Sequence, residues 1–379
     1  MAAIDLSAAF DTVDHEVLLN VLEAKFGITG AALKWFESYL LDRKCKVQIG
    51  DIYSISKNLQ FSVPQGSCMG PILYLAYAST LQEIIPTQIS VYGYADDHAL
   101  ATNFKANDKT SERQSITQLE KCMDNIKDWM DLNRLKMNSA KTEFILFGQT
   151  KQLQKTDTHA IEVVDDTIER SDSVKYLGVY LDKTLSMDKH ISHICRICML
   201  NLQRIKLIRS FLSVDSCKIL VQCLVISHLD YANAILATLP KSHLNKLQRV
   251  QNYAAKLILK CHIRDSSTES LKQLHWLPVH ARIDFKILTL VFKCLHDSAP
   301  LYLKSLINYR VNVRSGLRSA RDDKILEIPF TRSSKFADRS FSVCGPKIWN
   351  KLPYNIRNCS NLARFKRELK THLFIREYN

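Results

Sequence analysis

Three acidic side chains are the residues of this sequence with the clearest potential for chemistry. Asp96 and Asp97 are adjacent and lie between two apolar, strand-forming runs, which predicts a β-hairpin over 89–103 with both acids at its tip. Asp5 follows another short apolar run, which predicts the end of a strand. Adjacent carboxylates repel each other, and a divalent cation is the usual compensation. Most such pairs are nevertheless solvated turn residues, so the dipeptide alone leaves both interpretations open.

The elements that would position these acids divide the chain into two parts of different character. Apolar periodicity predicts strands near 2–6, 44–49, 53–63, 143–147 and 174–181, and helices near 15–26, 31–41, 70–81 and 111–135. The polar stretch 149–172 is expected to be loop with one weak strand. From 187 onward the pattern predicts helices near 187–212, 214–237, 241–261, 280–296 and 360–374. This change of pattern predicts a domain boundary near 183.

The charge of the chain changes at the same place. The 379 residues, enough for two or three domains, carry 52 basic and 38 acidic side chains, a net charge of +14. Residues 1–182 hold 18 basic and 25 acidic side chains, whereas 183–379 hold 34 and 13. An acidic first part and a strongly basic second part favour a metal-binding region followed by a polyanion-binding region. A basic domain without such a partner is the alternative.

The cysteines and the apolar runs indicate the compartment. Eleven cysteines are scattered without a disulfide framework, no secretory signal opens the chain, and no apolar run is long enough to span a membrane. We therefore expect an intracellular protein with free thiols. The run His193–Cys198 has two cysteines and a histidine, but no second pair stands nearby at zinc-ligand spacing, so a helix with buried thiols is expected there.

Further motifs follow the first acid at intervals along the chain. They are Asp5 with Phe10, Pro64-Gln65-Gly66, Tyr94-Ala95-Asp96-Asp97, the run 133–142 that contains Lys141, and Tyr176-Leu177-Gly178-Val179. Five blocks in this order resemble the palm of a reverse transcriptase, and most closely that of LINE-type (non-LTR) retrotransposons. The resemblance covers roughly residues 2–182. It implies an α+β fold, with an antiparallel sheet and flanking helices.

The resemblance implies RNA-directed addition of deoxynucleoside triphosphates to a primer 3′-hydroxyl. Transfer of this kind uses two Mg²⁺ ions about 3.5–4 Å apart, and Mn²⁺ is an alternative. Asp5 and Asp96 would bridge both ions, and Asp97 would assist. The backbone carbonyl of Leu6 would add one ligand. Asp11 and Asp14 lie past the strand end and are expected to be capping or surface acids.

Other roles are also carried over from the family. Phe10 would select the sugar, although a core phenylalanine is the alternative, and Gln65 and Gly66 would position the incoming nucleotide and template. Lys141 would assist the pyrophosphate leaving group, or it is an ordinary surface lysine. The family usually has glycine ahead of the proline of this motif. Ser62, two residues before that proline, departs from the pattern and would restrict the backbone.

Tyr176, Leu177 and Gly178 resemble the primer grip, a hairpin in which glycine lets the primer backbone approach closely. The alternative is a buried strand with a glycine at a bulge. Past this motif, basic residues recur on expected helices: Lys206, Arg209, Lys218, Lys241, Lys246, Arg249, Lys256 and Lys260. They fit a thumb that grips duplex phosphates without reading bases.

The expected division is a palm lacking its N-terminal part over 1–182, a helical thumb-like region over 183–263 and a helical basic region over 264–379. The last region contains the runs 274–279 (LHWLPV) and 341–353, which resemble the C-terminal region of animal LINE-type elements. We expect it to bind nucleic acid, through Arg310, Arg314, Arg318 and Arg321, or to serve as a helical scaffold.

The expected partners are an RNA template and a DNA primer or duplex, in the nucleus and cytoplasm. The family's fingers region and an upstream endonuclease are not in this sequence, so coding material upstream of Met1 is expected. Two alternatives remain: a catalytically inactive nucleic-acid-binding remnant of a mobile element, or an interaction protein that binds no nucleic acid.

Overall fold

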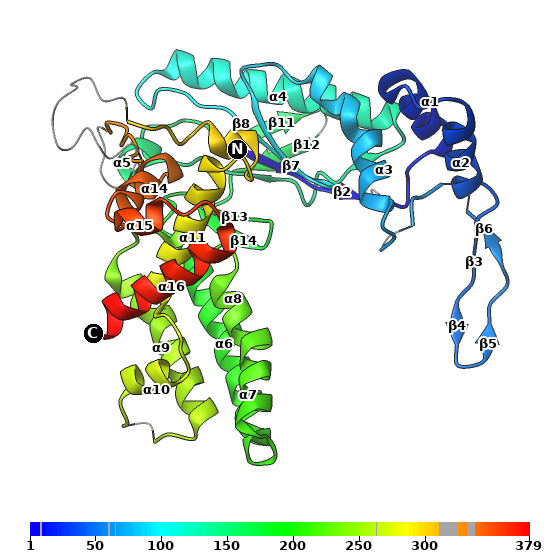
Figure 1. Ribbon diagram of the computed structural model, residues 1–379. Helices are drawn as coiled ribbons and strands as arrows, with labels where there is room; N and C mark the ends of the chain where they lie inside the picture. Colours follow the sequence, from blue (N-terminus) through cyan, green and yellow to red (C-terminus); the bar gives the residue numbers. More distant parts are fainter. Residues whose placement is uncertain are drawn as a thin grey trace. The chain divides into compact units, whose positions relative to one another are not determined.

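The computed structural model describes residues 1–7, 10–59, 61–64, 66–164, 166–262, 264–310, 324–331 and 338–379. Contacts divide the chain into two compact units, Met1–Leu185 and Ser186–Asn379. The first unit mixes helices with small antiparallel sheets, and the regular elements described in the second unit are helical, which confirms an α+β chain with a mainly helical C-terminal part (Figure 1). A further boundary at 263 stays a prediction.

A four-stranded antiparallel sheet forms the centre of the first unit. Its strands are, in order, β10 (Glu143–Phe144), β1 (Ala2–Ile4), β8 (Asp97–Ala101) and β7 (Ser90–Tyr94). Strand β1 pairs with β8 in the register Ala2↔Leu100 and Ile4↔His98. Beyond this sheet the chain continues into β2 (Leu6–Ser7), which pairs with β9 (Lys136–Met137). The hairpin predicted over 89–103 is confirmed.

The first unit contains five α-helices among its described residues, and side-chain caps mark the start of some of them. They are α1 (His15–Phe26), α2 (Gly30–Leu40), α3 (Gly70–Tyr77), α4 (Lys109–Leu132) and α5 (Thr150–Leu153). Asp14 caps α1 by accepting hydrogen bonds from the backbone N–H groups of Glu16 and Val17, which confirms its capping role. Gly27 ends the helix with φ of 65°, a conformation that glycine adopts without strain.

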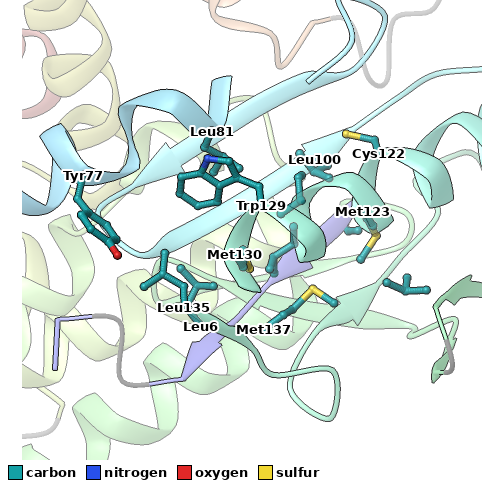
Figure 2. Close-up of a cluster of buried hydrophobic side chains, with 14 of the residues drawn as sticks. Leu6, Tyr77, Leu81, Leu100, Cys122, Met123, Trp129, Met130, Leu135 and Met137 are labelled. Atoms are coloured by element: carbon teal, nitrogen blue, oxygen red, sulfur yellow. The ribbon is translucent and has the colours of Figure 1, made fainter. Parts of the chain in front are cut away.

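The core of the first unit lies between the sheet and α4. Figure 2 shows Cys122, Met123, Trp129 and Met130 of α4 gathered with side chains from the sheet and from α3 and the turn after it. Leu100, in the middle of β8, is among the buried residues. The indole N–H of Trp129 donates to the Thr80 hydroxyl over 3.0 Å, which satisfies its one polar group. The period-3.6 pattern of α4 therefore predicted its buried face correctly.

An extended ribbon replaces the two long strands expected over 44–49 and 53–63. Its short strands are β3 (Lys44–Cys45), β4 (Gln48–Ile49), β5 (Ile52–Tyr53) and β6 (Lys57–Asn58). They pair β3 with β6 and β4 with β5 around a turn at Gly50, and the ribbon extends away from α1 and α2 (Figure 1). Ile49, Ile52 and Ile55 are each more than three-quarters exposed, so the alternation of the sequence does not mark a buried face here.

The stretch 149–172 contains more structure than its polarity predicted. Besides α5 it forms the hairpin of β11 (Ala160–Val163) and β12 (Asp166–Glu169). Ile161, Val163 and Ile168 are buried, and β11 contacts α4. A second hairpin follows, from β13 (Ser173–Tyr176) and β14 (Val179–Asp182). The packing of these three apolar residues outweighs the polar composition of the segment. Composition alone cannot show that α4 provides a surface for them to pack on.

The second unit is built from helices around an aromatic centre. Its helices are α6 (Asp188–Ile208), α7 (Val214–Val221), α8 (Ser227–Asp230), α9 (Lys241–Leu259), α10 (Ser267–Gln273), α11 (Val279–Leu295), α12 (Leu301–Lys304), α14 (Phe341–Trp349), α15 (Tyr354–Arg357) and α16 (Leu362–Tyr378). Phe292 of α11 stacks on Phe365 of α16 with ring centres 4.3 Å apart, and buried Trp349 packs on the same ring. None of the described helices is long and apolar enough to cross a bilayer.

The single helix expected over 214–237 is instead interrupted. A π-helical turn, Gln222–Ile226, separates α7 from α8, and α8 ends before Tyr231. Ala232 then takes a φ of 50°, and a 3-10 turn follows over Asn233–Leu236. Apolar residues keep helical spacing through these turns, so periodicity does not register a π turn or a residue in the left-handed region.

Candidate active site

The sheet brings the first predicted acid next to the other two. Ile4, the last residue of β1, pairs with His98 of β8, so the same register continued by one residue sets Asp5 opposite Asp97. Asp96 lies in the turn that joins β7 to β8, where Tyr94 pairs with Asp97. Residues 91 positions apart in the chain therefore meet at one end of two neighbouring strands.

The charges at this strand end oppose one another. Partial burial, followed by the negative charges of Asp96 and Asp5, raises the pKa of the Asp97 carboxyl above its ordinary value. Burial lowers the pKa of His98, and its Nδ1 lies 3.1 Å from the backbone oxygen of Asp96. Opposite His98 stands Gly93, where a Cβ atom would lie 3.2 Å from the imidazole. The repulsion expected between adjacent acids is thus present, and a third carboxylate adds to it.

Lys141 stands beside the first acid. Its Nζ lies 3.8 Å from Oδ2 of Asp5, and its side chain is 70% exposed. The segment that carries Lys141 is anchored at the same place, because the backbone N–H of Asn138 donates to the backbone oxygen of Asp5 over 2.9 Å. The backbone N–H of Thr142 donates to the Asn138 carbonyl and so closes a turn that contains Lys141. The lysine that the sequence singled out is therefore placed next to a predicted metal ligand, where it offsets part of the local negative charge.

The donor chemistry of this strand end suits a hard divalent cation. Asp5, Asp96 and Asp97 offer only oxygen atoms, which Mg²⁺ prefers, and their mutual repulsion favours bound positive charge. Within the described residues, however, no group of three or more His, Cys, Asp or Glu side chains is arranged to hold an ion. Leu6 is buried in the core beside Met137 (Figure 2), and a role for its carbonyl stays a prediction. The acids lie at one strand end without converging.

Phe10 joins this region to the core. It is partly buried against the core cluster, and its ring lies 4.8 Å from that of Tyr74, centre to centre. Tyr74 is fully buried, and its hydroxyl has no hydrogen-bond partner within the described part of the chain. Burial, and secondarily the charge of Asp96, raises the pKa of this phenol. Sequence reasoning missed Tyr74, which is one of two tyrosines in an otherwise apolar helix; nothing in the sequence distinguishes it from Tyr77.

The turn that follows Pro64 and leads into α3 depends on two glycines. Gly66 has φ of 83°, and a Cβ atom on Gly70 would lie 2.8 Å from the Pro64 carbonyl oxygen. Ser62 has φ of 106°, a region that side chains other than glycine rarely adopt. The expected restriction at Ser62 is thus present as an unusual conformation. Gln65 lies outside the described residues.

The predicted primer grip forms a tight hairpin next to β7. Leu177 and Gly178 are its turn, with φ of 46° and 77°, so the glycine serves a turn between β13 and β14 and no bulge. The Tyr176 hydroxyl donates to the backbone oxygen of Tyr92 over 3.0 Å. Burial, and then the charge of Asp97, raises the pKa of Tyr176. The hairpin therefore lies within electrostatic range of the acids.

The second unit holds the cysteines and basic side chains for which the sequence predicted roles. The run 193–198 lies in α6, as expected; Cys198 is buried there, and burial raises its pKa to about 12. Arg209 was expected to bind phosphate, which is wrong: its guanidinium is buried and donates to the backbone oxygens of Leu212, Leu257 and Ile258. Arg310 is exposed, and Arg314, Arg318 and Arg321 lie outside the described residues.

Comparisons with known proteins agree with the motifs. Residues 1–181 match the family model described as reverse transcriptase (RNA-dependent DNA polymerase). The chain is 27% identical to the probable RNA-directed DNA polymerase from transposon BS of Drosophila melanogaster, over 72% of this chain and 30% of that protein. It is 24% identical to the probable RNA-directed DNA polymerase from transposon X-element of the same species, over 85% and 34%. It is 27% identical to the RNA-directed DNA polymerase from mobile element jockey of Drosophila funebris, over 68% and 28%. The chain thus spans about a third of these relatives.

Proposed function

Because residues 1–181 belong to the reverse transcriptase family, and the chain is related to polymerases of non-LTR retrotransposons, we propose that this chain extends a DNA primer along an RNA template. The observation that supports the proposal most is the pairing of β1 with β8, which brings Asp5 to the hairpin that carries Asp96 and Asp97. In this proposal the first unit is a polymerase palm.

The residues at this strand end would divide the work. Asp5, Asp96 and Asp97 would hold Mg²⁺ or Mn²⁺, which when bound neutralises charge on the transferring phosphoryl group and activates the primer hydroxyl. Lys141, close to Asp5, would bind the pyrophosphate and supply a proton to it. Its exposure leaves the ammonium group free to move toward a substrate phosphate.

Two neighbouring segments would bind the substrates. Phe10, packed against Tyr74, would face the sugar of the incoming nucleotide, while Gln65 and Gly66 would contact its base pair. The left-handed turn at Gly66 would let the backbone approach that base pair closely. Tyr176, Leu177 and Gly178 would support the primer end, since the Tyr176 hydroxyl ties their hairpin to β7. These roles are carried over from the family.

Primer extension with a poly(rA) template and an oligo(dT) primer in Mg²⁺ tests the proposal. Asp96→Asn keeps the shape of the side chain and removes its charge, so extension should fall by at least ~100-fold while template–primer binding persists. Asp51→Asn, in the exposed turn of the β4–β5 ribbon, is the matched control and should extend as the parent does. Extension by the Asp96 variant at the parent's rate would refute the assignment.

A second candidate is an inactive protein that only binds nucleic acid. It is favoured by one observation: among the described residues, no three His, Cys, Asp or Glu side chains are arranged to hold an ion. In the same experiment this candidate predicts that the parent binds the template–primer and extends it no further than the Asp96 variant does.

In either case the second unit would grip phosphates, as a polymerase thumb does. Lys206, Lys241, Arg249 and Lys260 are exposed on or at the end of α6 and α9. Replacing all four with glutamine should weaken duplex binding and reduce the slope of log K against log salt by about 3 to 4. Replacing the three lysines with arginine keeps the charge and should leave the slope unchanged. An unchanged slope in the glutamine variant would show that these residues do not contact phosphates.

A further inference from the structure

A pocket of about 490 Å³ is lined only by residues of the second unit. The π-helical turn Gln222–Ile226 and the 3-10 turn Asn233–Leu236 contribute to its wall. The loop His275–Leu277 of the LHWLPV run and residues of α11 and α16 complete it. Pockets of this size commonly hold small organic ligands. A π turn within helices is also often found at a functional site.

One buried polar atom in this wall has no partner. Asn233 is 3% exposed, and its Oδ1 forms no hydrogen bond within the described part of the chain. Its Nδ2 lies 3.5 Å from Oδ1 of Asp230, and that carboxylate is held in turn by Nε and an Nη of Arg282. The Asp230–Arg282 pair therefore fixes the amide, and the carbonyl oxygen remains to accept. A buried acceptor without a donor is unfavourable, so a ligand N–H group that reached Oδ1 through a small shift of the pocket wall would be stabilised.

Flat apolar side chains stand beside this acceptor. Trp276 is buried and Phe285 is half-buried, and both line the pocket. The loop that carries Trp276 is held rigidly, because its backbone oxygen accepts from the Tyr378 hydroxyl over 2.7 Å and the Leu277 oxygen accepts from Gln251 over 2.9 Å. The aromatic wall is therefore formed before any ligand arrives, so binding would not have to pay the cost of ordering it.

Two cations complete the chemistry of the pocket. Lys286 of α11 and Lys370 of α16 line it and are exposed. Neither forms an ion pair with a described carboxylate. An aromatic wall, an acceptor for an N–H group and two ammonium groups together match a planar, N–H-bearing base joined to a phosphate.

We propose that this pocket binds one nucleotide, with its base against Trp276 and Phe285, a base N–H group on Asn233 Oδ1, and its phosphate on Lys286 and Lys370. The nucleotide is either free or an unpaired residue of a single strand. The site uses none of the acids of the first unit and does not depend on polymerisation. It gives the LHWLPV run a role in binding.

Titration of the full chain with the four ribonucleoside 5′-monophosphates, and with ribose 5-phosphate, tests the site. At least one nucleotide should bind ten times more tightly than ribose 5-phosphate. Lys286→Glu with Lys370→Glu should weaken that nucleotide at least tenfold. The matched pair Lys351→Glu with Lys366→Glu, at exposed positions outside the pocket, should change its affinity less than twofold. Circular dichroism melting of each variant verifies the fold.

A second variant separates base recognition from phosphate attraction. Asn233→Leu removes the acceptor and should weaken the tightest nucleotide at least threefold while ribose 5-phosphate binds as before. A single-stranded hexanucleotide then identifies the source of the ligand. If the hexanucleotide binds ten times more tightly than the mononucleotide, and the Lys286/Lys370 variant loses this gain, the natural ligand is a single strand. If the two bind equally well, the natural ligand is a free nucleotide. Failure of all four nucleotides and the hexanucleotide to bind, or binding that the pocket variants leave unchanged, overturns the proposal.

Discussion

Each unit contains a buried charged side chain that satisfies backbone groups, and the two side chains have opposite charge. In the first unit carboxylates accept from backbone N–H groups: Glu112 Oε1 accepts from Asp157 and Thr158. In the second unit a guanidinium donates to backbone carbonyls, as Arg209 does at the end of α9. Some of the excess acidic side chains of the first unit, and some of the excess basic side chains of the second, are therefore used in internal hydrogen bonds. Formal charge overstates what each unit offers to a ligand.

The comparison also separates structural acids from those at the candidate site. Glu112 lies among donors, and Asp14 accepts two backbone N–H groups and pairs with Arg134. Asp97 instead has carboxylates for neighbours, and its pKa is raised. A carboxylate whose neighbours penalise its charge is the one that a cation would stabilise.

Removing the buried guanidinium should have the largest effect on stability. Arg209→Leu removes three hydrogen bonds and leaves carbonyls near the end of α9 without their donor, so the free energy of unfolding should fall by about 3 kcal/mol. Denaturant titration measures the change. Lys206→Leu, at an exposed position of α6, should change it by less than about 0.5 kcal/mol. Equal losses in both variants would mean that the buried arginine is ordinary surface charge.

The corresponding test in the first unit concerns the buried carboxylate. Glu112→Leu leaves the N–H groups of Asp157 and Thr158 without an acceptor, so unfolding should become easier by about 2 kcal/mol. Glu112→Gln keeps an acceptor oxygen and should lose less than half of that amount. If glutamine costs as much as leucine, charge and not hydrogen bonding holds the 157–158 turn, and the parallel between the units fails.

Local rules predicted much of the fold, and tertiary contacts account for most of the differences. The long periodic helices α4, α6, α9 and α11 lie where their apolar spacing placed them. The β11–β12 hairpin was missed because its few apolar residues are buried only by contact with α4. The ribbon of β3 to β6 was misjudged for the opposite reason, since its apolar residues are exposed.

The candidate site was predictable in part. The hairpin that holds Asp96 and Asp97 follows from local pattern, but its neighbour β1 is fixed by pairing that no local rule supplies. The contact of Lys141 with Asp5 follows from the turn at Asn138. The sequence did not single out the Tyr74 hydroxyl or Asn233 Oδ1, because the lack of a hydrogen-bond partner within the described residues is a property of the packed structure.

A substitution beside the Pro64 turn should change the free energy of unfolding by a smaller amount and in the opposite direction. Ser62 has φ of 106°, so Ser62→Gly should raise the free energy of unfolding by about 1 kcal/mol through relief of strain. Ser38→Gly, in the last turn of α2, is the matched substitution in ordinary helix and should lower it by about 0.5 kcal/mol. Thermal melts of the two variants should therefore move in opposite directions. A lower melting temperature for the Ser62 variant would mean that the serine side chain stabilises this turn.

The smallest effect should appear in the pH dependence of Asp97. Because its folded-state pKa is raised, the folded chain holds this proton more tightly than the unfolded chain does, and ionisation above the ordinary value of 3.8 weakens the fold. Asp97→Asn should therefore be more stable than the parent at pH 7 without divalent ions, and the advantage should vanish below the ordinary pKa. Urea titrations of both chains from pH 3 to pH 7 measure the difference, with Asp51→Asn as the exposed control. Addition of Mg²⁺ at pH 7 should stabilise the parent more than the variant. A variant less stable than the parent at pH 7, or an advantage that does not change with pH, would show that Asp97 is a structural acid like Glu112.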